Sequence, residues 1–358
     1  MAGIGYSLAN TKSGLTLAVK GYSDKQGVLL NKIMDKLTGF KVDPARFTIL
    51  KELYARGLKN FQAEQPHQHA VYYNSVLLSD RVWHKEELIQ VGKENVFNNR
   101  LTDNCLQVLP NLTVEAVDDF IPRLLASLHV ECLVYGDSTP DRASALYRGV
   151  VNKLASDCAS RPLLPSQLIK EREVELKDAA SVYTTTNGVH RSSCIENYYQ
   201  CGMQDTRQNM LLELFSQIIN ENCYNQLRTQ EQLGYIVFSG VRRSNGAQGL
   251  RVIVQSDRHP VYLDQRIESF LAGVDTMLTD MDETEFKQHV EALASKRLEK
   301  PKKLSVRNGR YWSEILSQHY NFNRDEIEVY QSPKFITFFK LNLYIFRLAV
   351  CGSFPRRM

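Results

Sequence analysis

The sequence predicts an α+β protein with two domains, each an antiparallel-rich mixed sheet packed against helices. Three observations support this prediction. The chain of 358 residues is longer than one compact core usually supports. Both halves place strand-like segments before a long amphipathic helix, and the second half adds a hairpin signal followed by paired helices. The shared order of elements is consistent with a duplicated fold.

The first half is predicted to begin with a strand, because Leu15, Leu17 and Val19 alternate with polar or small residues. An apolar face at residues 29–37 then indicates a helix. Asp43 and Pro44 favour a further helix start, an N-cap followed by proline at the first helical position. The remaining expected elements are helices at about 66–78, 113–128 and 139–156, and a buried strand at 129–135.

A domain boundary is predicted at the segment RPLLPS, residues 161–166. Two prolines in four residues do not fit inside a helix or a central strand. The expected domains are therefore residues 1–165 and residues 166–358.

The second half is predicted to contain strands at about 172–176, 181–186 and 195–201, then a helix at about 206–227. Ser244, Asn245 and Gly246 form a hairpin signal between strands at 234–238 and 250–254. Helices are expected at 261–281, at 283–300 with Asp282 and Glu285 as a capping box, and at 304–319.

Composition is typical of a globular protein, with a formal charge of +4 that gives no reason to expect nucleic-acid binding. The seven cysteines include no CxxC pair, which favours free thiols in a reducing compartment. The N-terminal residues lack the features of a signal peptide, and the apolar segment 335–350 is interrupted by Lys340, Asn342 and Arg347 and is shorter than the ~20 residues of a membrane span. We therefore expect a cytoplasmic protein without a membrane span.

Charge is concentrated between residues 295 and 310, where seven Lys and Arg residues accompany one Glu. Such a run is usually a solvated face, but it also suits acidic peptides or polyanions.

The motifs that bind catalytic metals or activate nucleophiles are missing from the sequence. HxxEH, HExxH, GxSxG, GxGxxG and P-loop patterns do not occur. His67 and His69 form the only close histidine pair, and an i, i+2 pair on a helix points to different sides. We interpret these two residues as packing or hydrogen-bonding histidines, and no metal site is predicted.

The segment LRTQEQLGYIVFSG, residues 227–240, joins a buried helix to an apolar strand. Arg228 and Tyr235 lie at this junction. A structural interpretation places Arg228 at the helix C-terminus and Tyr235 on the sheet. A functional interpretation directs both side chains into a cleft, where a guanidinium and a phenol donate hydrogen bonds to a peptide carbonyl or oxyanion. Gly234 would let the backbone turn sharply beside a ligand.

This segment resembles the pitrilysin-type, or inverzincin, metalloendopeptidases. The resemblance extends to VKGYSDKQ (19–26), AEQPHQHAVYY (63–73), QGLRVIVQS (248–256) and RLEKPKKLS (297–305), among others. It covers about residues 3–90 and 113–328. Residues 91–109 and the tail from about residue 330 depart from the family pattern.

Several expectations follow from the resemblance. Family members have four homologous domains in two halves that enclose a chamber for short insulin-like or amyloid-like peptides. The chain corresponds to the C-terminal half, the third and fourth domains. Zinc and its HxxEH motif lie in the other half, so we expect this chain to be inactive alone and to partner a zinc-bearing half or a full-length homologue. Homo-oligomers are a further expectation.

Site residues follow from the resemblance in the same way. Arg228 and Tyr235 match family positions that contact the substrate near the scissile bond, and Tyr224 matches an aromatic position of the chamber wall. Lys300, Lys302 and Lys303 match a stretch linked to polyanion binding. The alternatives are a non-catalytic peptide-binding or regulatory subunit and a truncated gene model.

Overall fold

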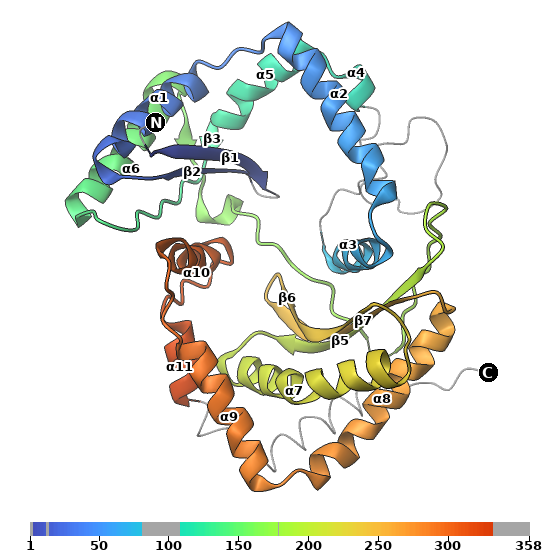
Figure 1. Ribbon diagram of the computed structural model, residues 1–358. Coiled ribbons are helices and arrows are strands. Elements are labelled where there is room, and N and C mark those ends of the chain that lie inside the picture. The colour runs from blue at the N-terminus through green and yellow to red at the C-terminus, as the bar shows by residue number, and fades with distance from the viewer. Residues whose placement is uncertain (1–2, 12–13, 81–107, 178, 332–358) are drawn as a thin grey trace. The chain divides into compact units, whose positions relative to one another are not determined.

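The computed structural model describes residues 3–11, 14–80, 108–177 and 179–331 (Figure 1). The contacts divide the chain into two units. The first comprises residues 1–60, 82–170 and 307–315, and the second comprises residues 61–81, 171–306 and 316–358. The main division thus falls after Lys170, and residues 61–81 group with the second unit although they precede the prolines of the predicted boundary.

The first unit combines a β-hairpin with several helices. β1 (Gly5–Thr11) and β2 (Gly14–Lys20) pair antiparallel, so the predicted strand at 15–19 is confirmed. The helices are α1 (Ser23–Thr38), α2 (Pro44–Asn60), α4 (Val108–Asn111), α5 (Val114–Leu125), α6 (Pro140–Cys158) and part of α10 (Leu304–Leu316). Asp43 caps α2 by accepting hydrogen bonds from the backbone N–H groups of Ala45 and Arg46, as the sequence predicts.

A small apolar cluster holds the first unit together. Met34 of α1, Leu125 of α5 and Leu154 of α6 are buried at its centre. By contrast, much of the predicted apolar stripe of α2 is exposed, including Leu50, Leu53 and Tyr54. This part of the apolar face of α2 is therefore not buried against other elements within the described residues.

The second unit is built on a three-stranded antiparallel sheet of order β5-β7-β6. The strands are β5 (Ser193–Met203), β6 (Ile236–Ser244) and β7 (Ala247–Ser256). The β6–β7 turn is the predicted hairpin, in which Asn245 and Gly246 have φ values of 49° and 83°. Helices and antiparallel strands in both units confirm the predicted α+β class.

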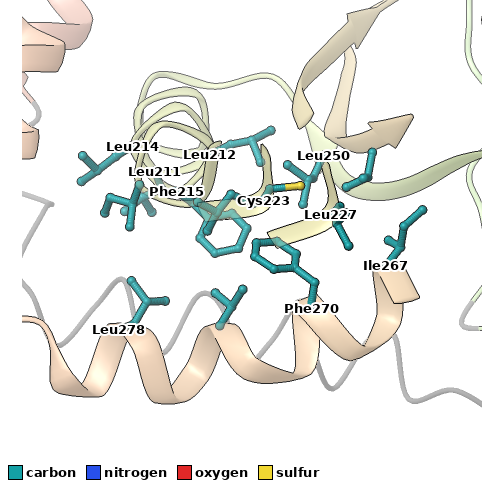
Figure 2. Packing of buried hydrophobic residues seen from close by; sticks show 14 of the residues in the cluster. Leu211, Leu212, Leu214, Phe215, Cys223, Leu227, Leu250, Ile267, Phe270 and Leu278 are labelled. Carbon is teal, nitrogen blue, oxygen red and sulfur yellow. The ribbon is translucent and has the colours of Figure 1, made fainter. Parts of the chain in front are cut away.

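One face of this sheet packs on α7 (Thr206–Tyr224) and α8 (Pro260–Asp280). Leu250, Val252 and Val254 of β7 alternate toward this core. Figure 2 shows Phe270 and Leu278 pointing from α8 toward α7, and Ile267 of α8 belongs to the same core. Two further helices, α9 (Glu283–Leu298) and α11 (Arg324–Gln331), contribute Phe286, Leu293 and Val329 to the same core.

Three of the predicted strands are wrong. Residues 129–135 lack strand structure because β3 (Ser127–Leu128) pairs only with the two residues of β4 (Arg161–Pro162), and proline has no N–H to extend the pairing. Residues 181–186 also form no strand. The strand predicted at 172–176 is reduced to an isolated bridge between Glu173 and Ser79. The backbone of this segment instead forms hydrogen bonds with the side chain of Gln200. This side chain accepts a hydrogen bond from Leu176 N–H and donates one to the Val174 carbonyl, at 2.8 and 2.9 Å.

Some predictions lie largely outside the described residues. They are the atypical insert at 91–109, of which only residues 108 and 109 are described, and the atypical tail from residue 330, described as far as residue 331. Within the described part of the chain, no helix is long and apolar enough to cross a membrane.

Candidate functional site

The candidate site begins where α7 ends. Asp205 caps the start of α7 by accepting hydrogen bonds from the N–H groups of Arg207 and Gln208. After Tyr224 the helix widens into a π-helical turn, η3 (Asn225–Gln230), which includes Arg228. Leu227 of this turn is fully buried, and its carbonyl accepts a hydrogen bond from Leu233 N–H at 3.0 Å. The buried leucine therefore fixes the position from which Arg228 projects.

The chain reverses after this turn at Gln232, which has a φ of 51°. The sequence interpretation assigned the sharp turn to Gly234, but the left-handed residue is Gln232. Gly234 serves a different geometric need, since a Cβ there would lie 1.9 Å from the carbonyl oxygen of Gln255 in β7. Glycine is therefore required because the two backbones approach closely at this point, directly before Tyr235 and the first residue of β6, Ile236.

The structure brings together three of the predicted site residues. The Arg228 guanidinium carbon lies 4.8 Å from the centre of the Tyr224 ring and 5.3 Å from the centre of the Tyr235 ring. Tyr235 is 89% exposed and Tyr224 is 38% exposed. Each cation–π contact at such an exposed site contributes about 0.5–1 kcal/mol. The two rings hold the guanidinium in place without using its N–H groups.

Among the residues that the structure describes, no carboxylate or carbonyl accepts a hydrogen bond from the Arg228 guanidinium. The hydroxyls of Tyr224 and Tyr235 likewise have no hydrogen-bond partner in this part of the chain. The cluster therefore presents a planar set of donors and two phenols to a ligand. Peptide carbonyls, carboxylates and oxyanions are the acceptors that such a set can bind.

Strand alternation places two further residues, which the sequence interpretation did not single out, on the other face of the sheet. Phe238 of β6 and Arg251 of β7 lie on the sheet face opposite the α7–α8 core, with the Arg251 guanidinium 5.2 Å from the centre of the Phe238 ring. Phe238 is 43% exposed. The period-two pattern of QGLRVIVQS could have identified Arg251, because the apolar residues on either side of it face the core.

The predicted polyanion-binding lysines are exposed and lie between α9 and α10. Lys302 forms an ion pair with Glu299 at 3.3 Å, and both side chains are mostly exposed. Lys300 and Lys303 are also exposed. No contact joins these lysines to the Arg228–Tyr235 cluster within the described residues, so the two sets are separate groups.

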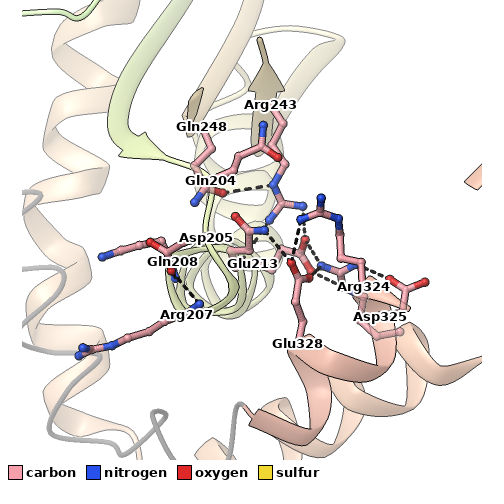
Figure 3. Close-up of polar contacts among 12 residues, drawn as sticks. Gln204, Asp205, Arg207, Gln208, Glu213, Arg243, Gln248, Arg324, Asp325 and Glu328 are labelled. Atoms are coloured by element: carbon pink, nitrogen blue, oxygen red, sulfur yellow. Dashed lines mark hydrogen bonds and ion pairs between the residues drawn. The ribbon is translucent and has the colours of Figure 1, made fainter. Parts of the chain in front are cut away.

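Arg297 does not belong to this basic surface, although the sequence interpretation counted it there. It forms ion pairs with Glu213, Asp325 and Glu328 at 2.8, 2.6 and 2.5 Å. Burial opposes the charge on Arg297, but the surrounding carboxylates outweigh it and raise the pKa of the guanidinium. Figure 3 shows Glu213 of α7 and Glu328 of α11 in this network. Arg297 thus connects three helices.

The described part of the chain was also searched for residues that could bind zinc together. No cluster of three or more His, Cys, Asp or Glu residues able to hold a metal occurs there. The His67 ring nitrogen Nδ1 lies 2.9 Å from the Gln255 side-chain oxygen, and the His69 ring packs 4.5 Å from the Phe61 ring. These contacts confirm the interpretation of both as packing or hydrogen-bonding histidines. The residues described do not fit a zinc site.

Comparison with known proteins gives the family. Residues 1–91 match the sequence profile of the middle or third domain of peptidase M16. Residues 214–312 match the profile of the C-terminal lobe domain 4 of PQQ synthase PqqF-like proteins. Insulin-degrading enzyme from Homo sapiens is 48% identical over 92% of this chain. The chain belongs to the pitrilysin-type, or M16, peptidase family. The insulin-degrading enzyme of Drosophila melanogaster, another relative, is 41% identical over 92% of the chain.

Solved structures of the M16 family share the fold. A crystal structure of pitrilysin matches 96% of this chain with a TM-score of 0.80 at 21% identity, and 34% of that chain is covered. The M16 peptidase inactive domain from Pseudomonas fluorescens matches 96% of the chain with a TM-score of 0.59, at 14% identity and 77% coverage. The M16 chain described here spans about a third of the length of its insulin-degrading relatives, 31% for the human protein.

Proposed function

We propose that this chain forms the substrate-contacting, non-zinc half of an M16 metalloendopeptidase that cleaves short insulin-like or amyloid-like peptides. The observation that carries the proposal is the Arg228 guanidinium, held between the rings of Tyr224 and Tyr235 with its N–H groups directed to no partner within the described residues. A buried structural arginine would be paired with a carboxylate, as Arg297 is. Arg228 instead is arranged for a ligand.

Each residue of the cluster has a role in this proposal. Arg228 and Tyr235 donate hydrogen bonds to the peptide backbone near the scissile bond and share the negative charge of the tetrahedral intermediate. Removing one such donor typically costs about 2.7–4 kcal/mol in the transition state. Tyr224 holds the guanidinium and lines the wall, and Gly234 allows the backbone next to Tyr235 to approach Gln255 of β7 closely.

The catalytic metal is proposed to come from a second polypeptide segment. Neither HxxEH nor HExxH occurs in the sequence. Zinc would supply an activated water in the assembled enzyme. The residues of this chain would bind and orient the peptide, which requires a zinc-bearing half or a full-length homologue as partner.

Reconstitution tests the proposal. The purified chain is mixed with the zinc-bearing N-terminal half of human insulin-degrading enzyme, and cleavage of a fluorogenic insulin-derived peptide is measured. We expect Tyr235→Phe and Arg228→Met to lower kcat at least 10²-fold, as loss of an oxyanion donor does in other enzymes by about 10²–10³. Tyr147→Phe, which removes the hydroxyl of an exposed tyrosine on α6, is the matched control.

Unchanged turnover in both variants would contradict the assigned roles. A different result, in which the reconstituted mixture binds the labelled peptide but does not cleave it, would instead assign the chain as a non-catalytic peptide-binding subunit.

A further inference from the structure

The π-helical turn that carries Arg228 is closed by an ion pair from α8. Arg266 donates two hydrogen bonds to the Glu231 carboxylate, from Nε and from a terminal nitrogen, each at 2.7 Å. This two-point geometry is the most directional form of a charge-assisted pair. The side chains of Arg266 and Glu231 are only 32% and 17% exposed.

Glu231 also connects the two ends of the turn. Its carboxylate accepts a hydrogen bond from the Gln226 side chain at 3.0 Å, and its backbone N–H donates to the Gln226 carbonyl at 2.9 Å. Gln226 lies two residues before Arg228, and Glu231 lies four residues before Tyr235. The loop between Gln226 and Glu231 is thus closed at its base, with Arg228 inside it.

The partner of Glu231 is rigidly held. Ile267, the residue after Arg266, is fully buried in the core, as is Leu263 one turn earlier on the same helix. The backbone of α8 at Arg266 is therefore fixed by packing. An ion pair to such a residue connects the turn to the core.

The turn needs this support because its backbone is locally unfavourable. A π-helical segment is a rare conformation. Gln232 has a left-handed backbone conformation, which residues other than Gly, Asn and Asp rarely adopt. Such features persist where surrounding contacts over-determine them. Leu227 and Leu233 anchor the turn in the core, Gly234 approaches β7 closely, and Glu231 adds the contacts that close the turn at its base.

We propose that Glu231 and Arg266 are positioning residues that act through Arg228 and Tyr235, keeping the guanidinium and the phenol in the geometry that binds substrate. This inference rests on the proposed function, because it assigns to the pair the task of orienting the substrate-contacting residues. Neither Glu231 nor Arg266 touches the ligand in this scheme.

The first test uses the chain alone and does not depend on activity. Hydrogen–deuterium exchange is measured for peptides covering residues 224–236 in the parent chain, in Arg266→Met and in Glu231→Gln. We expect at least tenfold faster exchange in this segment in both variants, with unchanged exchange in the β6–β7 hairpin. Lys287→Met, which removes an exposed ion pair with Glu283 on α9, is the control and should alter neither region.

The second test uses the reconstituted enzyme. We expect Arg266→Met to lower kcat about tenfold, and to have a smaller effect when Arg228 is already methionine, because the part of its contribution that acts through Arg228 is then already lost. Arg266→Lys keeps the charge but loses the two-point geometry, so it should recover part of the loss.

The outcomes separate the two proposals. Unchanged exchange at 224–236 in both variants overturns the positioning role, whatever the activity shows. Faster exchange with unchanged turnover also overturns it. If neither Arg228→Met nor Tyr235→Phe changes turnover, the proposed function fails, and this result is independent of the exchange measurement.

Discussion

Gly234 lies so close to β7 that a single added carbon would come within 1.9 Å of the Gln255 carbonyl oxygen. Gly234→Ala must therefore move either the segment that carries Tyr235 or the end of β7. Because overpacking of this kind typically costs about 1–3 kcal/mol, we expect a loss of that size in the free energy of unfolding. Urea denaturation followed by circular dichroism measures it.

Gly273 on α8 provides the matched control. A Cβ at this position meets nothing within 4 Å, and the residue lies inside a helix. Gly273→Ala should raise the free energy of unfolding by about 0.5–1 kcal/mol. Equal effects of the two substitutions would contradict the importance of the close approach at Gly234.

Arg297→Met should strongly destabilise the second unit. The substitution leaves the carboxylates of Glu213, Asp325 and the fully buried Glu328 without their shared cation. Breaking a buried ion pair on one side typically costs about 3–5 kcal/mol. Thermal or urea unfolding measures the change, and the double variant Arg297→Met with Glu328→Gln should recover part of it. A loss below 1 kcal/mol for Arg297→Met would show that the network contributes little.

Glu268→Gln should change how stability depends on pH. Burial raises the pKa of the Glu268 carboxyl, which accepts a hydrogen bond from Tyr199 at 2.6 Å. Since the folded pKa exceeds the unfolded one, the native state retains a proton between the two values. The contribution of this protonated carboxyl to the free energy of unfolding is fully present at a pH below the unfolded pKa, and it is lost as the pH rises through the folded pKa. The neutral amide carries no such dependence.

Urea unfolding between pH 4 and pH 8 tests this expectation. The stability of Glu268→Gln should fall less with rising pH than that of the parent chain. Glu291→Gln, an exposed glutamate on α9, controls for the substitution itself. A pH profile unchanged by Glu268→Gln would contradict the assignment.

Replacing Lys300, Lys302 and Lys303 by alanine should weaken binding of a polyanion such as polyphosphate. All three are exposed, and the ion pair of Lys302 with Glu299 is itself solvent-exposed. Binding of exposed cations to a polyanion should fall as salt rises. Fluorescence anisotropy at two salt concentrations measures both effects. The control variant replaces three dispersed exposed cations, Lys177, Arg191 and Lys287; an equal loss there would show that only net charge matters.

Local sequence patterns predicted the elements whose geometry is determined by neighbours in sequence. The hairpin at Asn245-Gly246 and the cap at Asp43 follow from backbone preferences alone, and the helices followed the apolar periodicity. The strand predicted at 129–135 failed because strand formation depends on a distant partner, and β4 ends in a proline.

The candidate site was predictable only in part. The helix-to-strand junction drew attention to Arg228 and Tyr235, the family resemblance added Tyr224, and the structure places the three side chains together. It did not reveal the role of Gln232, since a left-handed glutamine has no sequence signature. The same limit applies to Arg297, which looks like a member of a basic surface run until three carboxylates from elsewhere in the chain surround it.

The π-helical turn also makes the site more sensitive to how many residues the turn contains than to which residues they are. Such a turn contains one residue more than the α-helix it interrupts. Deleting one residue between Tyr224 and Arg228 would restore regular helical spacing and rotate Arg228 by about 100° around the helix axis. Point substitutions at the neighbouring exposed positions can therefore accumulate without redirecting the guanidinium, whereas a single-codon deletion would redirect it at once.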